Sequence, residues 1–206
     1  YLGVPVDVGV GNTSLMKFTS LFSRNVYAPV VGSIAAQVAK LAGARVIGIA
    51  GGPVKADYLT DTLGLDAAID YKNEDVSARL RKTCPDGIDL YFDNVGGDIL
   101  SDVLGQMNYR GRVVVCGGIS QYGGNMDVQG PSNFLSVVTH SLTIQGFTMR
   151  DYMHRIPEAL EWLSGAWKSD QLIFREHLIH GIERFPDAFE MLFTGQNHGK
   201  LLLKIN

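Results

Sequence analysis

The sequence predicts an α/β fold built on a doubly wound parallel sheet. From about residue 24 to residue 147, short apolar runs alternate with longer segments of helical period, which indicates successive βαβ units. The runs 46–49 and 113–115 are apolar throughout. Strands that are covered by helices on both faces need side chains of this kind.

Six strands are expected in the main part of the chain, and one short strand is expected near its end. Their ranges are 25–28, 45–50, 67–71, 88–94, 111–116 and 142–147, with the closing strand at 200–205. Right-handed crossovers between such strands give the Rossmann dinucleotide-binding arrangement.

The helices are expected between these strands. Ile34, Val38 and Leu41 share one helical face, and Gly43 can end that helix. The second helix is expected from Pro53 to Gly64. The later helices are marked by apolar positions at helical spacing: Val76 and Leu80; Ile99, Val103 and Met107; Ile156, Leu160, Leu163 and Trp167; Phe185, Phe189 and Leu192.

Three ranges are predicted from this organisation. Residues 1–23 follow no clear period and are treated as a remnant of a preceding region, residues 24–173 as the Rossmann domain, and residues 174–206 as a C-terminal segment. The composition is that of a soluble globular domain, with 46% hydrophobic and 19% charged residues and a net charge of −3. No basic stripe points to nucleic acid or a membrane surface.

The sequence also bears on the cellular compartment of the protein and on membrane anchoring. Two cysteines, Cys84 and Cys116, favour reduced cytosolic thiols over a disulfide scaffold. Lys40 and Arg45 interrupt the best apolar run, and we find no signal peptide in a chain that starts with Tyr1. We therefore expect a cytoplasmic location with no membrane partner.

The first candidate site is the turn that opens the first crossover helix. Gly32, preceded by Val31, fits the last glycine of a dinucleotide fingerprint, and the free N–H groups at this helix start suit a pyrophosphate. Pro29 stands where the middle glycine is expected, and proline has no N–H to donate. The alternative is a helix start with a packing glycine.

The end of the second strand carries the information on the type of nucleotide. NAD enzymes place Asp or Glu there to bind the ribose 2′-hydroxyl, but no acidic residue occurs from Ser33 to Lys55. Gly51 leaves room for a 2′-phosphate, Lys55 supplies a cation at a helix start, and Tyr71 can donate its hydroxyl. The alternatives are a solvated surface lysine and a half-buried edge aromatic.

Two further strand ends carry glycines where a cofactor would pass. Asn94 is followed by Val95-Gly96-Gly97, and Cys116 by Gly117 and Gly118. Tight turns are the alternative at both places. Cys116 is interpreted as a small core residue rather than a nucleophile.

At this point the sequence resembles a known family, the zinc-independent medium-chain reductases that include prostaglandin, alkenal and curcumin reductases. The resemblance runs from about residue 31 to residue 206 and rests on stretches in a fixed order. They are Val31-Gly32-Ser33, Val46 to Gly51, Lys55, Tyr58-Leu59, Leu63-Gly64, Asp66 to Lys72, Ile88 to Gly97, Cys116-Gly117, Ile119 to Tyr122, Gln145-Gly146-Phe147 and Gly199-Lys200.

The resemblance implies roles for individual residues. Lys55 and Tyr71 would hold the 2′-phosphate of NADPH, and Asn197 would contact the cofactor or line the cleft. Tyr122 would face the substrate. The nicotinamide side would be formed by Asn94, Ile119, Ser120 and Phe147.

The sequence departs from the family at Tyr27-Ala28-Pro29 and through residues 1–30 generally. The family also has a GroES-like catalytic domain, of which only a C-terminal piece, residues 174–206, would be present. A homodimer is a further implication of the resemblance.

The expected function is reduction by NADPH of a carbon–carbon double bond conjugated to a ketone or aldehyde. Tyr122, protonated at neutral pH, is the candidate donor to the developing enolate oxygen, with a loop aromatic at an interface as the alternative. An NADPH sensor, a redox-silent module and a quinone reductase remain alternatives, and a methyltransferase is disfavoured. The histidines are scattered and no cysteines cluster, so no metal site is expected.

Overall fold

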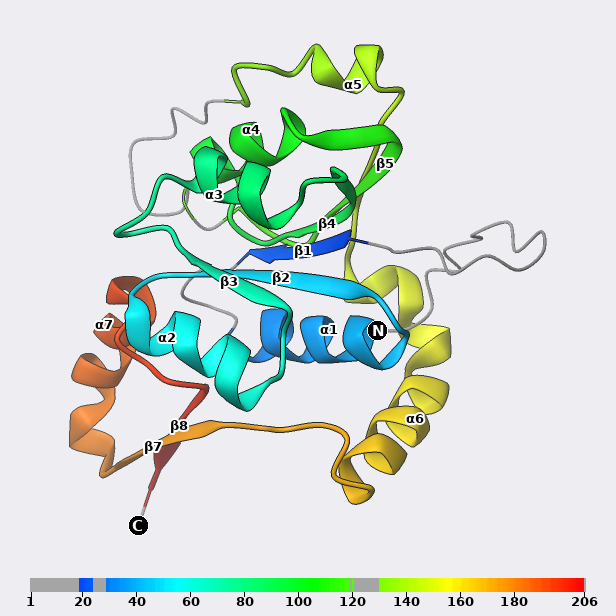
Figure 1. Ribbon diagram of the computed structural model, residues 1–206. Coiled ribbons are helices and arrows are strands. Elements are labelled where there is room, and N and C mark those ends of the chain that lie inside the picture. The colour runs from blue at the N-terminus through cyan, green and yellow to red at the C-terminus, as the bar shows by residue number, and fades with distance from the viewer. Residues whose placement is uncertain (1–18, 24–28, 119, 121–129, 206) are drawn as a thin grey trace.

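The predicted doubly wound sheet is confirmed by a computed structural model, which describes residues 19–23, 29–118, 120 and 130–205 (Figure 1). Six parallel strands lie in the order β3-β2-β1-β4-β5-β6. Their bounds are β1 Thr19–Ser23, β2 Arg45–Ala50, β3 Ala67–Asp70, β4 Ile88–Asp93, β5 Met107–Val115 and β6 Thr143–Gly146. Strand β1 lies at the centre of the sheet and the chain winds outward from it twice, so the strand order reverses between β1 and β4.

Helices cover the two faces of the sheet. Figure 1 shows α1 and α2 on one face and α3 and α4 on the other. Their bounds are α1 Pro29–Leu41, α2 Pro53–Asp57 with the π-helical turn η1 Tyr58–Thr62, α3 Val76–Thr83 and α4 Gly97–Leu104. The expected helix ends are confirmed at Gly43 and Gly64, which follow α1 and η1 with φ values of 83° and 65°.

The core forms in two clusters, one on each face. Successive side chains of β2 alternate between them: Val46 packs on the face of α1, whereas Ile47 and Ile49 pack on the face of α3 and α4. All three are fully buried. A strand that is buried on both faces therefore explains the uninterrupted apolar run, as expected.

Two predicted elements are wrong in position. The first described strand of the sheet is β1 at Thr19–Ser23, not 25–28. A strand therefore lies within residues 1–23, where the sequence shows no clear period. Residues 24–28 lie outside the described part of the chain. Met107 does not continue the fourth helix; α4 ends at Leu104 and Met107 begins β5, where its side chain is buried. A buried apolar residue after a helix fits the next strand as well as another helical turn.

The C-terminal part forms a second, two-stranded sheet in which β7 and β8 are parallel. Beyond β5 the elements are α5 Ser136–Thr139, β6, the 3₁₀ turn η3 Met149–Arg155, α6 Ile156–Lys168, β7 Glu176–His180, the 3₁₀ turn η4 Ile182–Arg184, α7 Phe185–Thr194 and β8 Lys200–Lys204. The sequence predicted α6, α7 and β8 but not β7. Gln37 of α1 connects this part to the main domain, because its side chain donates to the carbonyl of Ile173 at 3.0 Å and accepts from the Ile173 N–H at 2.7 Å.

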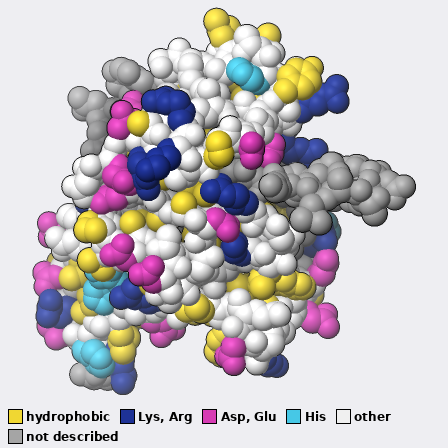
Figure 2. All heavy atoms as spheres, in the orientation of Figure 1, with side chains coloured by type: hydrophobic (Ala, Val, Ile, Leu, Met, Phe, Trp, Pro, Cys, Tyr) yellow, Lys and Arg dark blue, Asp and Glu magenta, His cyan; other side chains and the backbone are white. Residues whose placement is uncertain are grey.

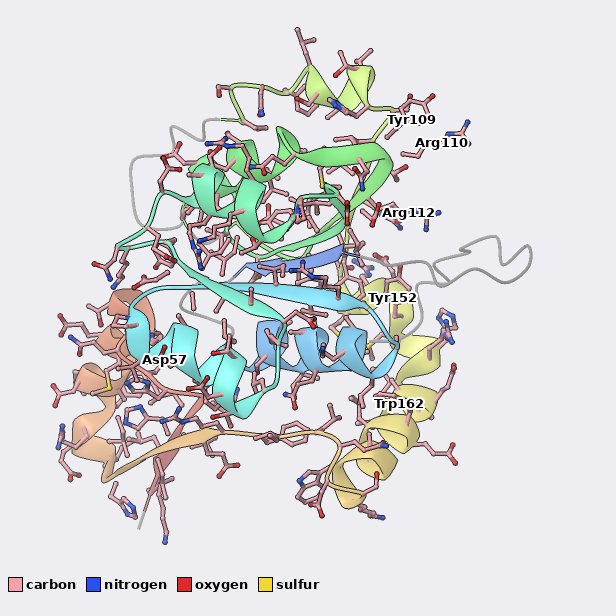
Figure 3. All side chains as sticks on the ribbon, viewed as in Figure 1. Asp57, Tyr109, Arg110, Arg112, Tyr152 and Trp162 are labelled. Carbon is pink, nitrogen blue, oxygen red and sulfur yellow. The ribbon has the colours of Figure 1, made fainter. Side chains whose placement is uncertain are left out.

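Hydrophobic side chains gather on the surface over α5, at the top of the view in Figure 2. Leu135 and Val138 are about three-quarters exposed. Nearby, the Arg110 guanidinium lies 5.5 Å from the Tyr109 ring centroid (Figure 3). None of the helices in the described ranges has the length and apolar character needed to cross a bilayer.

Candidate functional site

Most of the predicted site residues lie where parallel strands of the main sheet end. Gly51 follows β2, Tyr71 follows β3, Asn94 follows β4 and Phe147 follows β6. Because parallel strands present their carboxyl ends at one edge of a sheet, the fold brings these positions to a common edge, the usual place for ligands in such folds.

The ends of β2 and β3 meet at Gly51. A Cβ atom at this position would lie 2.9 Å from the Tyr71 ring and from its hydroxyl oxygen. The Tyr71 N–H also donates to the Ala50 carbonyl at 3.0 Å, which fixes the backbone of the two strands together. Glycine is therefore required for the tyrosine hydroxyl to lie against this turn.

Lys55 lies in α2, directly after the same turn, and its ammonium group donates to the carbonyl of Gly195. Gly195 ends α7 in the left-handed conformation (φ 69°), two residues before Asn197. The positive charge at the end of β2 is thus joined to the C-terminal segment. An ammonium carries three donors, so it can bind an anion at the same time.

A carboxylate that the sequence reasoning missed also reaches this turn. Asp70, the last residue of β3, is buried and accepts the Gly52 N–H at 2.6 Å and the Lys72 N–H at 3.1 Å on Oδ1, and the Asn73 amide at 2.6 Å on Oδ2. The stretch from Ser33 to Lys55 does lack acidic residues, but the neighbouring strand supplies one. Asp70 could not be placed at this turn from the sequence, because its position depends on the strand register that pairs Ala50 with Asp70.

The end of β4 is organised by a second buried carboxylate. Asp93 is 1% exposed, and its Oδ1 accepts the N–H groups of Val95 and Gly96, both at 2.9 Å, and the Tyr91 hydroxyl at 3.1 Å. Burial raises the pKa of the Asp93 carboxyl, and the three donated hydrogen bonds only partly oppose it. Asp93 therefore shapes the turn that carries Asn94, and sequence reasoning did not single it out.

Asn94 lies in this turn, and Ser120 is hydrogen-bonded to it. The side-chain oxygen of Asn94 lies close to Gly117, beyond the end of β5. The Ser120 hydroxyl donates to the Val95 carbonyl at 2.5 Å, and the Ser120 N–H donates to the same oxygen at 3.2 Å. These contacts bring Asn94, Gly117 and Ser120 together at one place.

Phe147 follows the edge strand β6 and is held by two contacts. Its N–H donates to the Val115 carbonyl at 2.8 Å. Its ring stacks on Tyr152, with 4.9 Å between centroids and 24° between planes. Cys116 is half-buried and packs against one of the two core clusters, in line with its interpretation as a core residue.

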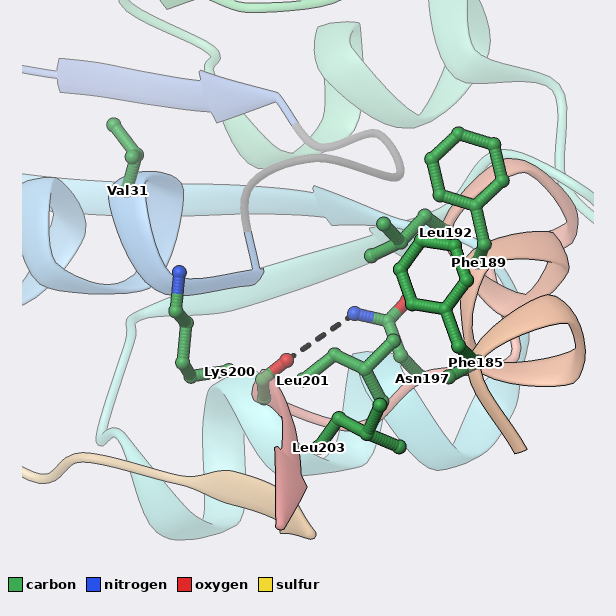
Figure 4. A pocket seen from close by; sticks show the side chains of 10 residues that line it. Val31, Phe185, Phe189, Leu192, Asn197, Lys200, Leu201 and Leu203 are labelled. Atoms are coloured by element: carbon green, nitrogen blue, oxygen red, sulfur yellow. Dashed lines mark hydrogen bonds between the residues drawn. The ribbon is translucent and has the colours of Figure 1, made fainter. Parts of the chain in front are cut away.

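Val31 and Asn197 line one cavity of about 370 Å³ beside α7 and β8 (Figure 4). Asn197 is 1% exposed, its amide donates to the Gly199 carbonyl at 3.2 Å, and its side-chain oxygen has no hydrogen-bond partner among the described residues. Phe185, Phe189, Leu192, Leu201 and Leu203 make most of the wall apolar. Gly32 lies next to Val31 within the first turn of α1, which starts at Pro29.

The remaining predictions concern Tyr122, Ile119 and metal binding. Tyr122 and Ile119 lie outside the described residues. Within the described ranges, no group of three or more His, Cys, Asp or Glu side chains is placed to hold a metal ion. His177 accepts the His198 N–H on Nδ1 at 3.3 Å, and His180, three residues along the same strand, points to the opposite face.

Comparison with known proteins agrees with this architecture. The chain is 40% identical over 178 residues to a 2-alkenal reductase (NADP⁺-dependent) of Nicotiana tabacum, which covers 85% of the chain and 51% of that protein. It is 37% identical over 181 residues to the NADPH-dependent curcumin reductase of Escherichia coli, covering 85% of the chain and 52% of that protein. The chain thus spans about half the length of these relatives.

A solved structure also shares the fold of this chain. The crystal structure of CurA from Vibrio vulnificus in complex with NADPH superposes with a TM-score of 0.85 at 38% identity, over 92% of this chain and 57% of that one. The family model described as zinc-binding dehydrogenase matches residues 30–165, which include α1 and every strand of the main sheet after β1. The chain therefore belongs to the zinc-binding dehydrogenase family.

Proposed function

We propose that this chain is the NADPH-binding part of a reductase that transfers hydride to a carbon–carbon double bond conjugated to a carbonyl. The observation that carries the proposal is the arrangement at the end of β2, where the Lys55 side chain starts from α2 and the Tyr71 hydroxyl lies against Gly51. A cation and a hydroxyl donor around a glycine suit a phosphate.

The residues at this turn fit the 2′-phosphate better than a free ribose 2′-hydroxyl. A hydroxyl would need a carboxylate with an available oxygen. Asp70 is the carboxylate that reaches the turn, and its Oδ1, the oxygen that contacts the Gly52 amide, already accepts two hydrogen bonds, from Gly52 and Lys72. The Lys55 ammonium, in contrast, is a donor that favours a dianion.

The residues at the other strand ends would bind the rest of the nucleotide. Gly117 and Asn94 would lie along the nicotinamide side, together with Ser120 and Phe147. The relatives support NADPH as the cofactor, since the CurA structure contains NADPH and the tobacco and E. coli relatives are named as NADP(H)-dependent reductases.

The chemistry follows from this placement. Bound NADPH supplies the hydride. Lys55 and Tyr71 anchor the adenosine end through the 2′-phosphate, while Asn94, Ser120 and Phe147 orient the other end, so the protein contributes mainly by positioning. As the new C–H bond forms at the β-carbon, the π electrons move to the carbonyl oxygen, and the α-carbon then takes a proton from solvent. A donor to that oxygen lowers the barrier.

Tyr122 is the proposed donor, on the basis of sequence. Its substitution by Phe, in the full protein, removes the hydroxyl and keeps the ring. We expect slower enone reduction with unchanged NADPH affinity. Unchanged turnover together with intact NADPH binding would assign the oxygen donor to another group.

The central test is a fluorescence titration of the full protein with NADPH, NADH and S-adenosylmethionine, followed by turnover of a simple enone and a simple quinone. We expect tight NADPH binding, weaker NADH binding and reduction of the enone. Preferred binding of NADH, or of the methyl donor, would refute the cofactor assignment. NADPH binding without turnover would favour the sensor, and preference for the quinone would favour a quinone reductase.

Assembly, location and metal content belong to the same proposal. We propose a cytoplasmic, zinc-independent enzyme acting on small molecules, and a homodimer, in which β6, an edge strand of the sheet among the described residues, can pair with a second copy. Metal analysis of the full protein and its mass in solution test these points. Stoichiometric zinc would contradict the first, and a monomer the second.

A further inference from the structure

The Asp70 carboxylate joins the two turns from which Lys55 and Tyr71 emerge. On one side it accepts the Gly52 N–H at 2.6 Å, and on the other the Lys72 N–H at 3.1 Å, both through Oδ1. A single oxygen atom therefore connects the residue after Gly51 to the residue after Tyr71.

Asp70 forms further hydrogen bonds that connect it to α3. Its second oxygen accepts the Asn73 amide at 2.6 Å, and its own N–H donates to the Glu74 carboxylate at 2.9 Å. Glu74 in turn forms a salt bridge with Arg79 of α3, also at 2.9 Å. Asp70 is 7% exposed, so little of its surface contacts solvent.

The charge of the acceptor strengthens these bonds, although an uncharged acceptor in the same place can form them too. Burial raises the pKa of the Asp70 carboxyl, but the hydrogen bonds from Asn73, Gly52 and Lys72 and the charge of Lys72 outweigh burial, so the pKa lies below its usual value. The group is ionised at neutral pH, and charge-assisted bonds to a carboxylate are about twice as strong as neutral ones.

Gly52 transmits this restraint to Lys55. Gly52 is the N-cap residue of α2 with φ 93°, and its carbonyl accepts the N–H groups of Lys55 at 3.2 Å and Ala56 at 3.1 Å. A shift of the Gly52 amide therefore rotates the first turn of α2 and moves the Lys55 side chain. On the other side, the Lys72 amide fixes the backbone that carries Tyr71.

We propose that Asp70 is a positioning residue that determines the preference for the 2′-phosphate by setting the spacing between Lys55 and Tyr71. The inference rests on the proposed NADPH site and adds a residue that need not touch the cofactor. Its function is geometric: the hydrogen bonds, not the negative charge, are required, since a negative charge beside a phosphate is unfavourable by itself.

Two substitutions separate geometry from charge. In Asp70→Asn, Oδ1 still accepts both amides, and the new Nδ2 donates to the Asn73 oxygen once that amide turns over. In Asp70→Glu the charge remains, but the carboxylate is displaced by one methylene. Asp66→Ala is the matched control, because that carboxylate accepts the Val46 N–H at 2.7 Å at the opposite end of the same strand pair.

The measurement is the ratio of dissociation constants for NADH and NADPH in the full protein, repeated with 5′-AMP and 2′,5′-ADP, with circular dichroism to verify folding. We expect Asp70→Glu to lower both ratios about tenfold, the effect of one lost charge-assisted bond. Asp70→Asn keeps or raises the ratio, and Asp66→Ala leaves it unchanged.

The proposal is overturned if Asp70→Glu binds with the wild-type ratio, or if Asp70→Asn loses as much preference as Asp70→Glu. The wild-type protein separates this failure from that of the proposed function. If it does not prefer NADPH over NADH, the proposed cofactor is wrong; if it does and the Glu variant keeps that preference, only the role of Asp70 is wrong.

Discussion

The side-chain oxygen of Asn94 lies 2.5 Å from the position that a Cβ atom would occupy at Gly117. The two residues follow neighbouring parallel strands, β4 and β5. Only a residue without a side chain at the end of β5 lets the amide of Asn94 extend across the edge of the sheet.

Gly117→Ala is therefore expected to displace the Asn94 amide, because 2.5 Å is well inside van der Waals contact. We expect weaker NADPH binding and slower enone reduction, with little loss of stability since an amide side chain can rotate. The control is Gly146→Ala at the end of β6, where a Cβ meets nothing within 4 Å. Equal effects of the two substitutions on NADPH affinity would contradict the proposed position of Asn94.

Lys55→Met keeps much of the side-chain length and removes its charge. We expect NADPH affinity to fall about ten- to a hundredfold, the effect of losing a charged hydrogen bond to the 2′-phosphate, while NADH affinity changes little. Isothermal titration measures both. Lys82→Met, an exposed lysine on α3, is the control and should leave both affinities unchanged. A parallel loss of NADH affinity would indicate that Lys55 acts through its bond to Gly195 instead.

Asp93→Asn should change how stability depends on pH. The pKa of Asp93 is raised in the folded protein, because burial disfavours the charge. The stability that this group contributes is present below its unfolded pKa of about 4 and is lost as the pH rises through the folded value. The variant has no such loss, so its stability relative to wild type should increase with pH, as measured by urea unfolding.

Asp66→Asn provides the opposite case. Burial raises the pKa of Asp66, but the Val46 N–H and the Lys40 ammonium outweigh it and lower the pKa overall. The contribution of Asp66 is present above its unfolded pKa and is lost as the pH falls through the folded value. The Asp66 variant should therefore lose stability relative to wild type as pH rises. Curves of the same slope for both variants would contradict the assigned shifts.

Gly199→Ala should be strongly destabilising. Gly199 has φ 94°, and a Cβ there would collide with the backbone carbonyl oxygen of Arg175, which accepts the Lys200 N–H at 2.7 Å. Strain at such a position costs on the order of 1–3 kcal/mol. Gly165→Ala, in an exposed turn of α6 with no neighbour within 4 Å, should instead stabilise by about 0.5–1 kcal/mol. Denaturant unfolding compares the two, and a neutral Gly199→Ala would count against the geometry of the β7–β8 pair.

The sequence predicted the main sheet well wherever a local signal was strong. β2 contains a buried apolar run, and Pro53 starts α2 as expected, because proline suits the first helical turn. The prediction failed at β1, whose residues Thr19–Ser23 carry no local signal of a central strand. It also failed at β7, where Glu176, His177 and His180 flank only two apolar residues and the partner strand β8 follows only after α7.

Local residue types by themselves determined the parallel α/β architecture, the glycine and proline boundaries, and the lack of an acidic residue directly after β2, because each depends on neighbours within a few positions. Only the folded chain decided which groups meet there. Asp70 reaches Gly52 because β3 pairs with β2, and Lys55 reaches Gly195 across 140 positions. Such contacts depend on strand register and on the docking of the C-terminal segment, and no local pattern encodes either.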